Sequence, residues 1–230
     1  MLFYCHPKKD QPDFLQFYKD LAANNNRDWF LANKKRYETS VKAPFEAFVQ
    51  QLIGLLKEKN PAIDLLPKDA IFRINRDVRF SKDKTPYKLC SSAIVSLGGK
   101  KDHISPGLYI EVGPEKVAVY GGIYMPEKEQ LDAIRKHICT NTAQFEAQLS
   151  SKDFLDTYGT LHGDKNKILP KEFQEAAKKQ PLIYNKAFYF YNHMKPEAAL
   201  KNDFAAQVML RYKAGKPMAD FLFAALRTKN

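Results

Sequence analysis

Three arginines stand within seven positions of one segment, at Arg73, Arg76 and Arg79. A guanidinium group presents a rigid fork of N–H donors that matches phosphate or carboxylate, so an arginine cluster suits anion recognition. In an extended segment alternate side chains point to opposite faces, which places Arg73, Asn75, Asp77 and Arg79 together. The spacing therefore predicts a row of donors that includes one carboxylate.

The apolar residues of the same segment alternate with this polar row and are expected on the opposite face: Phe72, Ile74, Val78 and Phe80. Residues 81–86 are predicted to form a turn, because they lack apolar periodicity and Pro86 holds the residue before it in an extended conformation. A second strand is expected to begin near Tyr87.

The predicted ligand site consists of this face, the loop that follows it and side chains from a later hairpin. Its residues are Arg73, Asn75, Arg76, Asp77, Arg79, Ser81, Lys82, Lys84, Tyr87, Lys88, Tyr109, Glu111 and Tyr124. We favour a binding protein or enzyme for a small anionic ligand that bears phosphate or carboxylate. Two alternatives stay open: a structural or interaction domain in which Asp77 and the arginines form internal ion pairs, and a nucleic-acid binder with a basic surface.

The composition fits one large domain, 1–230, because 230 residues with 44% hydrophobic content can bury a substantial core. The net charge of +11 comes from 37 Lys and Arg against 26 Asp and Glu. The lysines are scattered from Lys8 to Lys229, as on a solvated surface, whereas the arginines cluster only at 73–79.

Familiar catalytic and metal-binding motifs are missing from the sequence. It has no phosphate-binding P-loop, no glycine-rich dinucleotide fingerprint, no nucleophile elbow and no HExxH helix. The three cysteines, Cys5, Cys90 and Cys139, are far apart and expected to be free thiols, and the five histidines stand singly. We expect no structural metal, and the sequence leaves catalytic residues, cofactor and oligomeric state unassigned.

The N-terminal residues lack the apolar core of a signal peptide, and no window approaches the ~20 apolar residues of a membrane span. The sequence therefore predicts a cytoplasmic protein that does not associate with membranes.

Apolar periodicity predicts helices at both ends of the chain. One helix should run from Pro12 to the Asn24–Asn26 run, which also caps a second helix that starts at Arg27. Pro44 is expected to break or kink that helix, and a third pattern continues to about Lys59. After the middle of the chain, a helix should open at Pro126, and short helices are expected at 144–149 and 154–158.

Strands are expected in the middle of the chain, at 72–74, 89–97, 108–112 and 116–124, and the last two should form a hairpin. Gly121 and Gly122 leave room for backbone or ligand to approach closely. Residues 159–182 are predicted to be loop, 187–191 a further strand, and the C-terminus two helical stretches separated at 215–217. This order indicates an α+β fold: a central antiparallel sheet flanked by N- and C-terminal helices.

Four blocks of the sequence, at 22–45, 72–88, 106–112 and 121–135, resemble in content and order a widespread microbial family known as domain of unknown function 2461 (DUF2461). The most distinctive block contains RDVRFSKDKTPYK, from Arg76 to Lys88. The resemblance implies one full-length domain and marks these blocks as characteristic. It carries no established activity, cofactor or catalytic residue that could be transferred to this chain.

Overall fold

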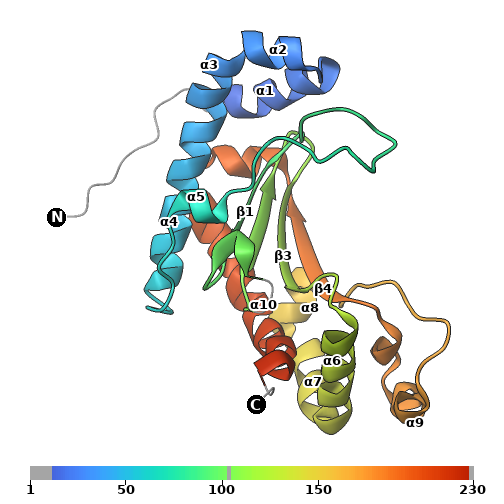
Figure 1. Ribbon diagram of the computed structural model, residues 1–230. Coiled ribbons are helices and arrows are strands. Elements are labelled where there is room, and N and C mark those ends of the chain that lie inside the picture. Colours follow the sequence, from blue (N-terminus) through green and yellow to red (C-terminus); the bar gives the residue numbers. More distant parts are fainter. Residues whose placement is uncertain (1–11, 103–104, 228–230) are drawn as a thin grey trace. The chain divides into compact units, whose positions relative to one another are not determined.

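The computed structural model describes residues 12–102 and 105–227, with helices towards both ends of the chain and a sheet from its middle (Figure 1). The antiparallel sheet has four strands in the order β1-β2-β3-β4. Their bounds are β1 Ser91–Val95, β2 Leu108–Val112, β3 Val117–Ile123 and β4 Phe188–Met194. The predicted α+β class with flanking helices is confirmed.

The first two helices follow the sequence pattern closely. Helix α1, Pro12–Ala23, ends at the asparagine run, and α2, Arg27–Ala32, begins directly after it. The Asn26 side chain accepts a hydrogen bond from the Trp29 backbone N–H at 2.9 Å, which satisfies one of the unpaired donors at the start of α2. The predicted capping role of this run is therefore confirmed.

Pro44 does not end the next helical stretch. Helix α3, Lys34–Tyr37, continues through a π-helical turn, η1 Glu38–Lys42, into α4, Ala43–Lys57, where Pro44 lies in the first turn. Proline cannot donate to the preceding turn, and a wider π turn placed just before it accommodates that missing bond. The break expected at Pro44 is therefore a change of helical pitch.

The prediction that residues 72–74 form a strand of the sheet is wrong. After the short helix α5, Pro67–Ala70, this segment makes only isolated antiparallel bridges, Ile71 with Ala93 and Asn75 with Tyr87. The Arg76 N–H donates to the Pro86 carbonyl at 2.8 Å, and Pro86 has no N–H with which to continue the ladder. Strand β1 is shorter than the predicted 89–97, and the fourth strand is β4, from the predicted 187–191 segment.

The β2–β3 hairpin is confirmed, closed by a hydrogen bond from the Gly113 N–H to the Lys116 carbonyl at 3.1 Å. Leu108, Ile110 and Val112 are buried, whereas Tyr109 and Glu111 between them are partly exposed. This alternation means that one face of β2 packs on the core and the other meets solvent.

Contacts divide the chain into two compact units. Unit 1 is Met1–Lys101, Tyr109–Ala118 and His193–Ala206; unit 2 is Asp102–Leu108, Val119–Asn192 and Gln207–Asn230. In unit 1 the core lies between the N-terminal helices and β1, where the Tyr18 hydroxyl and Ser91 Oγ form a buried hydrogen bond of 2.7 Å. The single 1–230 domain expected from the sequence stays a prediction.

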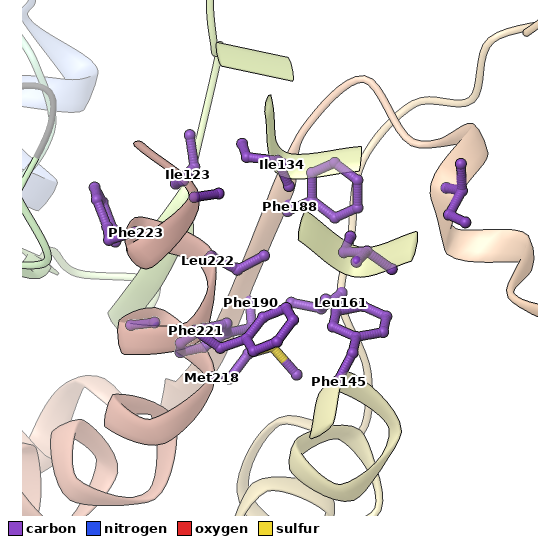
Figure 2. Packing of buried hydrophobic residues seen from close by; sticks show 14 of the residues in the cluster. Ile123, Ile134, Phe145, Leu161, Phe188, Phe190, Met218, Phe221, Leu222 and Phe223 are labelled. Atoms are coloured by element: carbon purple, nitrogen blue, oxygen red, sulfur yellow. The ribbon is translucent and has the colours of Figure 1, made fainter. Parts of the chain in front are cut away.

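In unit 2, strand-borne side chains Phe188 and Phe190 meet Phe145, Met218 and other buried residues (Figure 2). Five helices supply residues to this cluster: α6 Lys128–Thr140, α7 Thr142–Leu149, α8 Lys152–Tyr158, α9 Lys171–Lys179 and α10 Phe204–Arg227. Helix α10 begins in unit 1 and continues into unit 2. The predicted short helices are confirmed as α7 and α8. Helix α6 starts two residues after Pro126, because Glu127 and Gln130 form a capping box there.

Two predictions for the last third of the chain are wrong. Helix α9 lies within the predicted loop; its sequence is mostly charged, and only Phe173 and Ala177 are buried. Helix α10 runs unbroken through residues 215–217, with Pro217 inside it. Gly215 lies inside this helix beside the Phe190 ring, which a Cβ at that position would meet at 2.3 Å.

The two glycines of β3 allow the close approach that the sequence predicted, and protein atoms fill the space. A Cβ on Gly121 would lie 2.5 Å from the Phe190 ring, and a Cβ on Gly122 would lie 2.3 Å from the Phe188 carbonyl oxygen.

None of the helices in the described ranges has both the length and the apolar character needed to cross a bilayer. Cys90 and Cys139 are free thiols, and Cys5 lies outside the described residues.

Candidate functional site

Residues 73–88 form a long loop between α5 and β1, which we call the basic arm (Figure 1). It contains six lysines and arginines and two aspartates. The two sides of its base are joined by backbone hydrogen bonds of 2.8 Å, from Lys88 N to Ile74 O and from Arg76 N to Pro86 O. The arm is therefore an irregular antiparallel hairpin.

The base of the arm is fixed to the N-terminal helices of unit 1. Tyr87 is buried, and its ring stacks on that of Phe30 with centroids 4.2 Å apart. The Asn25 side chain both donates to the Tyr87 carbonyl at 2.9 Å and accepts from the Tyr87 N–H at 3.1 Å. Tyr87 was predicted as a ligand-binding residue, and the structure places it as the anchor of the arm.

Arg76 joins the two sides of the arm further out. It donates to Asp83 Oδ2 at 2.6 Å and to the Thr85 carbonyl at 3.1 Å, and it also contacts the Thr85 hydroxyl. Asp83 in turn accepts from the Thr85 N–H at 2.9 Å. The Thr85 backbone N–H and then the Arg76 guanidinium lower the pKa of Asp83 to about 2, so this carboxylate is ionised at neutral pH.

Arg79 pairs with Asp77 two residues earlier, with Nη2 donating to Oδ2 at 2.7 Å and Nε to Oδ1 at 3.0 Å. The Arg79 side chain is nevertheless 76% exposed, so much of it still meets solvent. Phe80 beside it is 95% exposed, with the Arg79 guanidinium 5.7 Å from its ring centre. Phe80 was expected with Ile74 on the face opposite Arg79, and this prediction is wrong, because the chain turns at residues 79–80 and the strand alternation stops there.

The rest of the predicted polar face is on the surface, as the alternation requires. Arg73, Asn75 and Asp77 are exposed, and Ile74 between them is buried. In the loop Lys82 is exposed and Ser81 half-buried. The Lys84 ammonium donates to the Val78 carbonyl at 3.0 Å, which braces the turn.

A second cluster of predicted residues lies beside the base of the arm in unit 1. The Tyr109 hydroxyl donates to Glu111 Oε1 at 2.8 Å, and its ring meets Phe72 edge-on at 5.9 Å. The Lys88 ammonium lies over the Phe72 ring, 5.3 Å from its centre. The structure thus brings Tyr109, Glu111 and Lys88 together through Phe72.

Burial favours the uncharged forms of three groups in and next to this second cluster: Tyr109, Cys90 and His193. Burial and then the Glu111 carboxylate raise the pKa of Tyr109, and the same two causes raise the pKa of Cys90 to about 11. Burial and then Lys116, whose Nζ is 3.3 Å from His193 Nε2, lower the pKa of His193. A protonated thiol and a protonated phenol are poor nucleophiles.

Tyr124, the remaining predicted residue, belongs to unit 2. Its ring is 70% exposed and meets Tyr189 edge-on at 5.2 Å. Sequence reasoning missed the roles of Asn25 and Thr85, which have only the weak signal of polar residues next to predicted turns. It also missed that Tyr189 and Tyr191 share the outer face of β4, although the alternating FYFY run indicates it.

Metal binding finds no support in the described ranges, where no three His, Cys, Asp or Glu side chains are grouped as ion ligands. The expectation of no structural metal stays a prediction.

Two cavities of the described chain are lined only by unit 2 residues. One is water-sized, at about 10 Å³, and the other is an open groove of about 300 Å³. Neither includes a residue of the basic arm.

The fold and the site define a basic α+β protein with an exposed arginine- and lysine-rich arm. The chain belongs to the family of conserved hypothetical proteins DUF2461, whose model matches residues 13–221. No curated protein matches the sequence.

Proposed function

We propose that this chain binds nucleic acid through phosphate groups, with the basic arm as the contact surface. The observation that carries the proposal is the exposure of the arm's outer part. Arg79 is 76% exposed and Phe80 95% exposed, on a segment whose base is anchored by Tyr87 and Asn25. Exposed guanidinium and ammonium groups beside an exposed ring suit a phosphate polymer.

An extended partner fits the arm better than the small anionic ligand that the sequence favoured. Small-ligand sites enclose most of the ligand's surface in a cavity. The two cavities described above contain no residue of the arm, and Arg73, Arg79 and Lys82 are exposed on an irregular loop. Such a surface can follow successive phosphates, each of which contributes to affinity.

The competing structural interpretation assigns the arginines to internal ion pairs. It accounts for Arg76, whose pair with Asp83 and Thr85 joins the sides of the arm. It accounts less well for Arg79, because exposed ion pairs contribute little stability, and for Lys82, which lies exposed on the same loop. A purely structural arm would need neither residue to be cationic.

The test replaces Arg73, Arg79 and Lys82 together by alanine. Because all three are exposed, we expect the thermal unfolding midpoint to stay unchanged. Affinity for a fluorescein-labelled oligothymidylate at moderate salt should fall roughly 10- to 100-fold, as three phosphate contacts are lost. Fluorescence anisotropy measures this loss directly.

The matched control removes the same charge from unit 2, with Lys171, Lys178 and Lys179 of α9 replaced by alanine. These side chains are exposed on one helix, and we expect affinity to change by less than about three-fold. Equal losses in the two triple variants would show only non-specific attraction to a basic protein and would refute the arm as a site. No binding by the parent protein would refute the function itself.

A further inference from the structure

The outer face of unit 2 carries five neighbouring aromatic rings, which we call the aromatic platform: Tyr120, Tyr124, His162, Tyr189 and Tyr191. Tyr120 lies in β3 and contacts Tyr191 of β4, and Tyr124, directly after β3, contacts Tyr189 of β4. His162 joins through an antiparallel bridge with Tyr189. The rings come from three neighbouring segments of the chain.

The rings lie close enough to act as one surface. His162 stacks on Tyr191 with centroids 4.6 Å apart and planes at 25°. Tyr191 lies 6.4 Å from Tyr189 at 22° and 5.8 Å from Tyr120 at 46°. Along β3, Gly122 carries no side chain between Tyr120 and Tyr124, and the β4 backbone at Phe188 and Tyr189 lies directly against it.

This face is not the core of the unit. The alternate residues Phe188 and Phe190 are buried in the cluster of Figure 2, whereas Tyr189 and Tyr191 are only partly buried. Tyr124 is 70% exposed. The solvent-facing positions of a strand are ordinarily occupied by polar residues. A group of aromatic rings at such positions offers π-faces to a partner.

We propose that the aromatic platform stacks unpaired nucleobases, so that the nucleic acid bound by this chain is single-stranded. Every base has a π-face, and aromatic rings on an open sheet face bind successive bases by stacking. A chain of net charge +11 also complements the phosphates that accompany those bases. The inference takes its class of ligand from the proposed function but rests on other residues, in the other unit.

The test compares two ligands of equal charge: oligothymidylate and an abasic strand with the same number of phosphates. The parent protein should bind the oligothymidylate roughly ten-fold or more tightly, because only that ligand has bases to stack. Replacing Tyr124 and Tyr191 by alanine should abolish the preference and leave affinity for the abasic strand unchanged. Replacing both by phenylalanine keeps the rings and should retain the preference.

The outcomes separate this inference from the proposed function. The control is Ile168→Ala, which shortens an apolar side chain of unit 2 that is 83% exposed. This substitution should not change the preference for oligothymidylate over the abasic strand. Equal affinity of the parent for the two strands, or for single strands and duplex, would overturn the platform and leave phosphate binding by the arm intact. Binding of a glycan or protein but no nucleic acid would overturn both proposals.

Discussion

At the scale of single residues, the ion pair between Arg76 and Asp83 joins the two sides of the basic arm. Their contact is charge-assisted, and the Thr85 N–H and hydroxyl complete it. Asp83 has its pKa lowered to about 2, so the ionised form is favoured in the folded arm. The resulting stabilisation is complete above the unfolded pKa of about 4 and is lost as pH falls towards 2.

We expect carboxyl NMR titration of the parent protein to give Asp83 a pKa near 2. In Arg76→Ala the pKa should rise but stay below that of a free aspartate, because the Thr85 N–H, the largest cause of the shift, is still present. Asp64, paired with Lys57 outside the arm, is the control, and its lowered pKa should not change. An unperturbed Asp83 in the parent would contradict the described arm.

The residue types at this site could be recognised from the sequence, but their partners could not. The alternation that exposes Arg73, Asn75 and Asp77 around buried Ile74 follows from the strand-like pattern. That Arg76 would choose Asp83 over Asp77, and that Phe80 would face solvent, depends on where the chain turns. Turn positions are set by local backbone geometry that composition does not specify.

At the scale of elements, Gly122 tests the packing of β3 against β4 that places the platform rings. Its φ of 86° and the 2.3 Å approach to the Phe188 carbonyl exclude a side chain. Gly122→Ala should therefore destabilise the protein by about 2–4 kcal/mol, through strain and overpacking. Chemical denaturation gives the free energy of unfolding.

Gly54→Ala is the matched control for that substitution. Gly54 lies in α4 with open space around it, so alanine there should stabilise by about 0.5–1 kcal/mol through its higher helix propensity. If both substitutions were neutral, the close approach of β3 and β4 at Gly122 would be wrong.

Elements with strong local patterns were predictable, such as α1, α2 and the β2–β3 hairpin. Features that depend on distant partners were not: a strand was expected at 187–191, but its pairing with β3 was not, and the length of β1 depends on what pairs beside it. Helix α9 was not predicted, because most of its residues are charged and its apolar periodicity rests on Phe173 and Ala177. Helix α10 continues through Pro217, where the sequence pattern predicted a separation.

At the scale of the whole molecule, the chain passes between its two units several times, so neither unit is one continuous stretch of sequence. The α+β class and the family followed from the order of elements and blocks along the chain. The division into units did not, because it depends on contacts between segments remote in sequence. The proposed phosphate contact concerns residues of unit 1, and the inferred base stacking concerns residues of unit 2.

The salt dependence of binding tests the central claim, phosphate recognition by the basic arm, most directly. The logarithm of the association constant for oligothymidylate should fall linearly with the logarithm of salt concentration, by about 0.7 for each phosphate contacted. Replacing Arg73, Arg79 and Lys82 by alanine should make this slope shallower by about two, whereas the α9 triple variant should keep the parent slope. A slope that is identical in the parent and the arm variant would contradict the account.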